Sequence, residues 1–201
     1  MRASYLYVFS SDAVVDKEIN GVIADDLVSR RRSFMRDADN ATAGSEDDLG
    51  TPNQMVFDIR CDEALSTTAL LSIECKSYSD LGGAHPNDEH FAYNFGICAG
   101  KPCTSLTLAA LCKPDASWKT TILDLIRQKL LRKLSTQGVE FLNLDDYSGA
   151  LKSFAITSTG LRFFANDLPH VIASAAVIDI PFKQLSSILR RDGPLAALLP
   201  P

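Results

Sequence analysis

Apolar residues recur at every third or fourth position along two stretches of the chain, a spacing that predicts two long amphipathic helices. The first begins after Asp12, the expected N-cap, and runs to about Met35. The second begins after Asp115, also an expected N-cap, and ends at Gly138. The apolar positions that define them are Val15, Ile19, Val22, Ile23 and Leu27 in the first helix and Trp118, Ile122, Leu125, Ile126, Leu130 and Leu134 in the second.

Shorter runs rich in aromatic and β-branched residues, some with alternating apolar and polar positions, predict strands. Two of these runs flank Thr157–Gly160, a sequence typical of a tight hairpin turn. A helical turn is expected over Leu106–Leu111, and Pro181 is expected to open a final helix through Leu185, Ile188 and Leu189. The expected strands are Tyr5–Phe9, Met55–Cys61, Ala69–Tyr78, His90–Cys98, Phe154–Ile156, Leu161–Phe164 and Ala173–Ile180.

Hairpins with helices between them predict an α+β fold, with antiparallel sheets and a long helix packed on each half. The polar segment of small residues from Asp37 to Asn53 is interpreted as a loop between the first helix and the strands that follow. The pattern contains no internal repeat and no clear linker. At 201 residues, the chain is long enough to bury one good core, with two sublobes as the alternative.

Charge argues against one class of partner. The net charge is −5 and the pI is near 5.2, whereas a nucleic-acid surface usually shows as a basic face. The run Arg30–Arg32 is short and has acidic neighbours, so it is interpreted as a solvated helix face.

Charges interrupt every apolar stretch before it reaches the roughly 18–20 residues that span a bilayer. The apolar residues at the N-terminus are too few for a signal-peptide core.

The five cysteines bear on the compartment. Cys98 and Cys103 bracket a turn-like sequence, so their sulfur atoms can meet across it. Cys61 and Cys75 fall on the apolar positions of two neighbouring strands and can face each other in a hairpin, although the sequence does not give the register. Cys112 has the surroundings of a buried apolar thiol. At least one disulfide is expected, which favours an exported protein; the alternative is a cytosolic structural protein with five free thiols.

The segment Ser77–Asn87 is the strongest local feature, because it places a glycine pair, a histidine and an X-Pro bond between two strands. A Gly-Gly pair allows positive φ angles that other residues resist, and such loops often carry function. His85 is expected to anchor this loop, with a ligand-binding role as the alternative. The candidate binding residues are Gly82, Gly83, Ala84, His85, Asn87 and Tyr93.

Catalytic and metal sites have weaker support. His85, Asp88, Glu89 and His90 lie close in sequence, but they lack a helical His-Glu-x-x-His spacing, and no Cys-x-x-Cys knuckle is present. Ser77 and Ser79 near His85 invite a catalytic triad, yet the Gly-x-Ser-x-Gly elbow is missing. We therefore expect no metal, no cofactor and no catalytic residues. The aromatic residues near Tyr93 suit either an exposed patch or the core side of a strand.

The order of several motifs resembles a known family. The chain carries Tyr78–Asn87, Tyr93-Asn94-Phe95, Ala99-Gly100-Lys101, Leu106–Leu111, Phe154-Ala155-Ile156, Thr159–Phe164 and Val177–Phe182 in that order. This order resembles the envelope domain of unknown function found at the C-terminus of RsiV-type anti-sigma factors and beside some peptidoglycan deacetylase domains. Gly82-Gly83-Ala84-His85 is the most specific element, and the likeness extends from about Val14 to Leu189.

The resemblance implies two parts in one module: residues 1–78 as a smaller N-terminal α/β part and residues 79–201 as the RsiV C-terminal-like domain. It also implies a periplasmic or extracellular location, with the export signal outside this chain. In the RsiV type, the domain binds lysozyme and acts as a sensor. This chain lacks the transmembrane and sigma-binding segments of that type, and its cysteines are not part of the recognised pattern.

Two functional hypotheses follow from the sequence. The first is a non-enzymatic binding module of the cell envelope that recognises a lysozyme-like protein or peptidoglycan. The second is a hydrolase or deacetylase-associated enzyme that acts on the cell wall, with His85 and nearby carboxylates as acid and base. A deep pocket with a perturbed pair of titratable groups favours the enzyme, and an acidic groove without such a pair favours the binding module.

Overall fold

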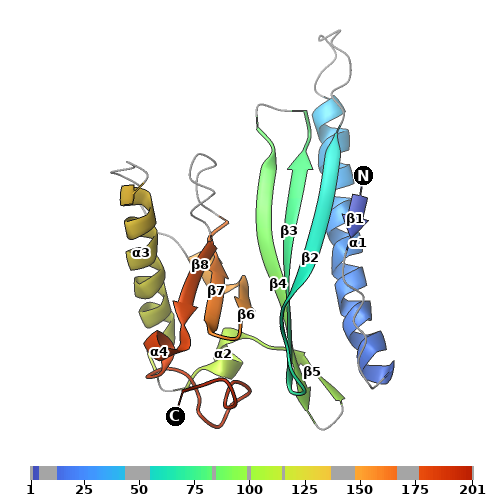
Figure 1. Cartoon of the computed structure of the whole chain (residues 1–201). Coiled ribbons are helices and arrows are strands. Elements are labelled where there is room, and N and C mark those ends of the chain that lie inside the picture. Colours follow the sequence, from blue (N-terminus) through green and yellow to red (C-terminus); the bar gives the residue numbers. More distant parts are fainter. Residues whose placement is uncertain are drawn as a thin grey trace.

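The computed structural model describes residues 2–4, 13–43, 55–82, 85–98, 101–114, 116–136, 148–166 and 177–200. Within these ranges, the chain forms a five-stranded and a three-stranded sheet together with helices, which confirms the α+β class (Figure 1). The elements in chain order are β1 (Arg2–Ser4), α1 (Ala13–Ala43), β2 (Val56–Ser66), β3 (Leu70–Asp80), β4 (Asn87–Cys98), β5 (Lys101–Ser105), α2 (Leu108–Leu111), α3 (Trp118–Thr136), η1 (Ser148–Leu151), β6 (Phe154–Ile156), β7 (Gly160–Phe164), β8 (Val177–Pro181) and α4 (Phe182–Leu185).

The larger sheet has the strand order β1-β2-β3-β4-β5. Its strands β2 to β5 pair antiparallel with their neighbours, while β1 adds a parallel edge strand beside β2. The smaller sheet, β6-β7-β8, is antiparallel throughout. Two described helices, α1 and α3, are long, as the apolar spacing predicts. No helix in the described ranges is long and apolar enough to cross a membrane.

One face of the larger sheet packs against α1. Alternate residues of β2, β3 and β4 point to this face because side chains along a strand alternate between its two sides. They include Phe57, Ile59, Ile73 and Phe91, which are buried with Ile19 and Ile23 of the helix. The ring of Phe34 on α1 stacks on that of Phe57, with centroids 4.9 Å apart. Figure 1 shows α1 running along the long strands of this sheet.

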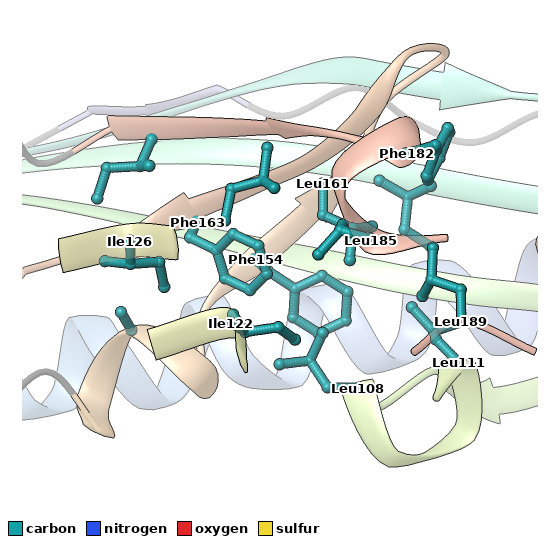
Figure 2. Close-up of a cluster of buried hydrophobic side chains, with 14 of the residues drawn as sticks. Leu108, Leu111, Ile122, Ile126, Phe154, Leu161, Phe163, Phe182, Leu185 and Leu189 are labelled. Atoms are coloured by element: carbon teal, nitrogen blue, oxygen red, sulfur yellow. The ribbon is translucent and has the colours of Figure 1, made fainter. Parts of the chain in front are cut away.

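The second core lies on the other side of the larger sheet and joins the smaller sheet to α2, α3 and α4. Figure 2 shows Phe154 and Phe163 of the smaller sheet beside Ile122 and Ile126 of α3. Ile122, Ile126 and Phe163 are completely buried. Leu65 and Leu70 of the larger sheet belong to this same core, so the β2–β3 hairpin contributes to both cores.

A buried polar cluster joins the two sheets. The side chain of Asn94 on β4 donates a hydrogen bond to the carbonyl of Phe154 at 2.7 Å. Ser72 on β3 donates to Asn94 at 2.7 Å and accepts from the backbone N–H of Ile156 at 2.9 Å. β6 is an edge strand of its sheet, so these side chains satisfy backbone groups that have no strand partner there.

The first helix extends beyond its expected end. It continues to Ala43, so residues 37–43 are helical and the expectation of a loop from Asp37 is wrong for them. Phe34 and Ala38, four positions apart, are both buried, which shows that the helical packing face continues. The residues between them lie on the solvent side of the helix, so the sequence there reads as a polar loop although the helix continues. Residues 44–54, Tyr5–Phe9, Asp12, Asp115 and Gly138 lie outside the described residues.

The final helix is shorter than expected. Pro181 ends β8 and is the N-cap residue of α4, but this helix ends at Leu185 and does not reach Leu189. Leu189 forms an isolated antiparallel bridge with Cys112 instead, and both residues are buried.

The expected division of the chain at residues 78 and 79 falls inside β3, which pairs with β2 on one side and β4 on the other. That division stays a prediction.

Candidate functional site

A disulfide connects β2 and β3 on the face that packs against α1. Cys61 lies directly opposite Cys75 in the antiparallel register, with their Cα atoms 4.0 Å apart, and the two sulfur atoms are bonded. Both residues are buried in the first core, as the apolar parity of their strands predicts. Cys112 is a buried free thiol, which confirms its interpretation. The side chains of Cys98 and Cys103 lie outside the described residues, so their pairing stays a prediction.

The first glycine of the loop after β3 has a positive φ, which the Gly-Gly pair allows. Gly82 has a φ of 79°, in the left-handed region that glycine adopts without strain. Its N–H donates a hydrogen bond of 2.8 Å to the side chain of Asp80, which fixes the start of the loop. His85 and Asn87 are exposed at its far end, while Gly83 and Ala84 lie outside the described residues.

Tyr93 lies away from this loop, in a charged cluster between β4 and α1. Its hydroxyl donates to the carboxylate of Asp26 at 2.7 Å. Arg30 forms ion pairs with Asp26 at 2.8 Å and Glu89 at 2.9 Å, and its guanidinium lies 3.7 Å from the ring centre of Phe91. Burial, and then the hydrogen bond to Asp26, raise the pKa of Tyr93. This cluster holds α1 against the sheet, so Tyr93 has a packing role here.

A hollow of about 340 Å³ lies between α1 and the sheet, beside the glycine loop. Asn87, Ser77 and Ser79 line it, but His85 does not. Strand alternation also separates the residues considered for a metal site. Glu89 pairs with Arg30 of α1, whereas Asp88 pairs with Lys76 at 3.3 Å on the other face of the sheet. Within the described ranges, no group of three or more His, Cys, Asp or Glu residues is arranged to hold a metal ion.

A larger groove, of about 740 Å³, lies where the outer face of the larger sheet meets the rim of the smaller one. We call it the inter-sheet groove. Strands β2, β3 and β4 form one side of it, and the Thr157–Thr159 turn with β7 and β8 forms the other. Its charged lining residues are Arg60, Asp62, Glu63, Glu74, Lys76, Arg162 and Asp179.

Arg162 connects the two sides of the inter-sheet groove. Its Nη1 donates to Glu74 of β3 at 2.9 Å, while its Nε donates to Asp179 of β8 at 2.8 Å. A second, longer hydrogen bond of 3.3 Å from Nη2 makes the contact with Asp179 bidentate. The hydrogen bonds to Asp179 raise the pKa of Arg162, and the contact with Glu74 adds to this effect. Both carboxylates are therefore held next to a permanent positive charge.

His90 lines the inter-sheet groove as well. Its ring stacks on Phe164, with centroids 5.5 Å apart, and its Nδ1 lies 3.9 Å from a carboxylate oxygen of Glu74. That nitrogen is buried and has no hydrogen-bond partner among the described residues. Asn166 binds the backbone of His90 through both ends of its amide, at 3.0 and 2.7 Å. Burial lowers the pKa of His90, although Glu74 opposes this shift.

Comparison with solved structures gives a fold likeness. A crystal structure of a DUF3298 family member from Bacteroides fragilis matches with a TM-score of 0.55 and 17% identity, over 89% of this chain and 72% of that one. A DUF3298 family protein from Pseudomonas aeruginosa PAO1 matches with a TM-score of 0.50 and 17% identity, over 73% of this chain and 65% of that one. No family model matches the sequence, and no curated protein matches it.

The likeness supports the fold of a domain of unknown function. It leaves the RsiV-type relationship and the binding roles of Gly82, Gly83, Ala84, His85, Asn87 and Tyr93 as predictions.

The sequence did not predict the inter-sheet groove. Its residues carried a signal in the alternation of charges on β2 and β3, but Arg162 and Glu74 are 88 positions apart and only the fold brings them together.

Proposed function

We propose that this chain is a non-enzymatic binding module of the cell envelope, whose partner is a lysozyme-like protein or a component of the cell wall. The proposal rests first on the inter-sheet groove. It is a hollow of the size range typical of ligand sites, roughly 300–1,000 Å³, and it is open to solvent along a polar face.

The observation that supports binding over catalysis is the pairing of charges in this groove. Glu74 and Asp179 both accept hydrogen bonds from Arg162, Lys76 pairs with Asp88, and Arg60 pairs with Asp58 at 2.9 Å. A general acid or base must reach the proton that it transfers, whereas these carboxylates are already engaged with cationic side chains. Fixed ion pairs are suited to recognition, since they present charges in set positions.

A location in the cell envelope is supported by the Cys61–Cys75 disulfide. Disulfides form and persist mainly in oxidising compartments such as the periplasm or the exterior, whereas cytosolic thiols are kept reduced. The pair is buried beneath α1 and is part of the first core, so it serves the stability of the fold. We infer a periplasmic or extracellular location on this ground.

A basic partner is supported by the net charge of −5, because an acidic protein attracts a cationic one over a distance of several ångströms. Lysozymes are commonly basic. The exposed residues His85 and Asn87 at the end of the glycine loop are the proposed contact with such a protein, together with Gly82, Gly83 and Ala84 before them. Tyr93 contributes by fixing β4 on α1, through its hydrogen bond to Asp26.

Calorimetric titration of the purified protein against lysozyme and, separately, against soluble muropeptides tests the proposal. Saturable binding of at least one of them is expected. The affinity for lysozyme is expected to fall as the salt concentration is raised to about 0.15 M. At that concentration, salt screens the attraction between exposed charges that lie more than about 8 Å apart. Absence of binding to both probes, by protein shown to be folded, would overturn the proposed function.

A further inference from the structure

We propose that the inter-sheet groove binds a zwitterionic peptide: a short chain segment that presents an ammonium group and a carboxylate roughly 7 Å apart. The inference rests on the proposed function and deepens it, since it assigns recognition of cell-wall material to the peptide portion. The groove is separate from the glycine loop, and its charged residues were not among those that the sequence indicated.

The first observation is an unusual arrangement of charges on β2 and β3. In the antiparallel register, Asp62 lies directly opposite Glu74, and Arg60 lies directly opposite Lys76. All four side chains line the groove. Like charges directly opposite each other destabilise a sheet, and here two such pairs are adjacent. Departures from local rules of this kind are expected at functional surfaces.

The two pairs form two bands of opposite charge across the strands. Asp62 and Glu74 form the acidic band, and Arg60 and Lys76 form the basic band. Residues two positions apart on a strand point to the same face and are separated by roughly 6.5–7 Å. A ligand that carries both charges at this separation neutralises both bands at once, whereas a ligand of one charge neutralises one band and is repelled by the other.

The second observation is unused binding capacity in each band. In the acidic band, Glu74 is engaged by Arg162, but the carboxylate of Asp62 is exposed and has no ion-pair or hydrogen-bond partner among the described residues. The neighbouring carboxylate of Glu63 is exposed and without such a partner as well. Arg60 uses only Nε for Asp58 and its side chain is 77% exposed, which leaves its two terminal nitrogens for a carboxylate in a bidentate contact. Lys76 is also half exposed and makes one ion pair in the described structure.

The length of the ligand follows from the separation of the bands. An extended chain advances at most 3.3–3.6 Å per residue, so the terminal ammonium and carboxylate of a dipeptide span roughly 7 Å. His90 and the Arg162–Glu74 pair also line the groove, and the backbone of the peptide is placed against them.

Titration of the full chain with alanyl-alanine, in the L,L and D,D forms and followed by NMR chemical-shift changes, tests the inference. N-acetyl-alanyl-alanine lacks the ammonium group and alanyl-alanine amide lacks the carboxylate. Each blocked peptide is expected to bind at least about tenfold more weakly than the zwitterion, since charge-assisted hydrogen bonds are the strong ones. Shifts are expected at groove residues.

Two charge-removing variants assign each band. Asp62→Asn is expected to weaken binding of the zwitterion and to leave binding of the N-acetyl peptide unchanged. Arg60→Gln is expected to weaken binding of the zwitterion and to leave binding of the amide unchanged. Asp25→Asn and Arg31→Gln, at exposed positions of α1 on the opposite face of the larger sheet, are the matched controls and are expected to have no effect.

Equal affinity for the zwitterion and both blocked forms would overturn the inference, as would binding that neither Asp62→Asn nor Arg60→Gln affects. Either result, obtained while lysozyme or muropeptides still bind, rejects the groove assignment and leaves the proposed function in place. Absence of binding to the dipeptides, to lysozyme and to muropeptides alike rejects both the groove assignment and the proposed function. If the charges are only a solvated surface, Asp62→Asn raises stability slightly and changes no binding curve.

Discussion

Gly82 occupies a backbone conformation that other residues resist, with a φ of 79° at the start of the glycine loop. Left-handed angles bring a Cβ atom close to the following carbonyl oxygen, and only glycine avoids this contact. The backbone at this position thus depends on glycine, and Asp80 stabilises it by accepting a hydrogen bond from the Gly82 N–H.

Gly82→Ala is expected to lower the free energy of unfolding by about 1 kcal/mol or more, because it introduces strain at positive φ. Gly21→Ala is the control: Gly21 lies in α1 with open space around it, so alanine there is expected to add about 0.5–1 kcal/mol. Urea unfolding curves measure both. An unchanged curve for Gly82→Ala would show that the loop needs no special backbone shape.

His90 carries a pH dependence of stability. Burial lowers its pKa below the ordinary 6.5, so the unfolded state binds this proton more tightly than the folded state does. Its contribution to stability is therefore complete above about pH 6.5 and is lost as the pH falls through the lowered pKa of the folded state. Glu74 and Asp88 oppose this shift, and Lys76 and Arg162 reinforce it.

His90→Phe is expected to remove this part of the pH dependence while it keeps the ring stacked on Phe164. The free energy of unfolding of both proteins, measured between pH 7.5 and pH 5, gives the comparison. The wild type is expected to lose more stability on acidification than the variant. Identical losses in the two proteins would show that His90 titrates alike in the folded and unfolded states.

At the scale of elements, the link between the sheets depends on Ser72 and Asn94, which bind the free edge of β6. Asn94→Ala leaves the buried carbonyl of Phe154 without this partner and is expected to cost about 1–3 kcal/mol. Asn87→Ala, at an exposed position in the same strand, is the control and is expected to change stability by less than about 0.5 kcal/mol. Chemical denaturation of both variants measures their free energies of unfolding. Equal losses in the two variants would show that the Ser72–Asn94 cluster does not contribute to stability.

The β2–β3 hairpin is also closed by the Cys61–Cys75 disulfide, which joins residues 14 positions apart. A cross-link of that length restricts the unfolded chain and contributes about 3 kcal/mol. The double variant with alanine at both positions is expected to be less stable by about this amount and insensitive to reducing agent. A wild-type protein whose unfolding midpoint does not change on reduction would contradict this role.

The elements differ in how far the sequence predicts them. The strands around Cys61 and Cys75 are predicted well, because alternating positions report directly which face is buried. The end of α1 is not, since burial of Ala38 depends on a neighbouring sheet and small residues also occur in loops. The inter-sheet groove depends on Arg162 reaching Glu74 across 88 positions, and no local pattern encodes such a contact.

At the scale of the whole molecule, the larger sheet has two different faces. One is closed by α1 and holds the disulfide, and the other is shared between the second core and the polar inter-sheet groove. The fold likeness to a DUF3298 family structure extends over 89% of this chain, so it includes parts of both sheets. The face closed by α1 therefore serves stability alone, whereas the other face combines the second core with the surface proposed for binding.

The most direct test of the account is an equilibrium titration with soluble peptidoglycan fragments in which the ligand is recovered and analysed by mass spectrometry. The account predicts saturable binding, recovery of the fragments with unchanged mass and linkage, and no chemical change by either the wild type or His85→Ala. Fragments that are cleaved or deacetylated by the wild type, but recovered intact from His85→Ala, would contradict it and establish an enzyme that uses His85.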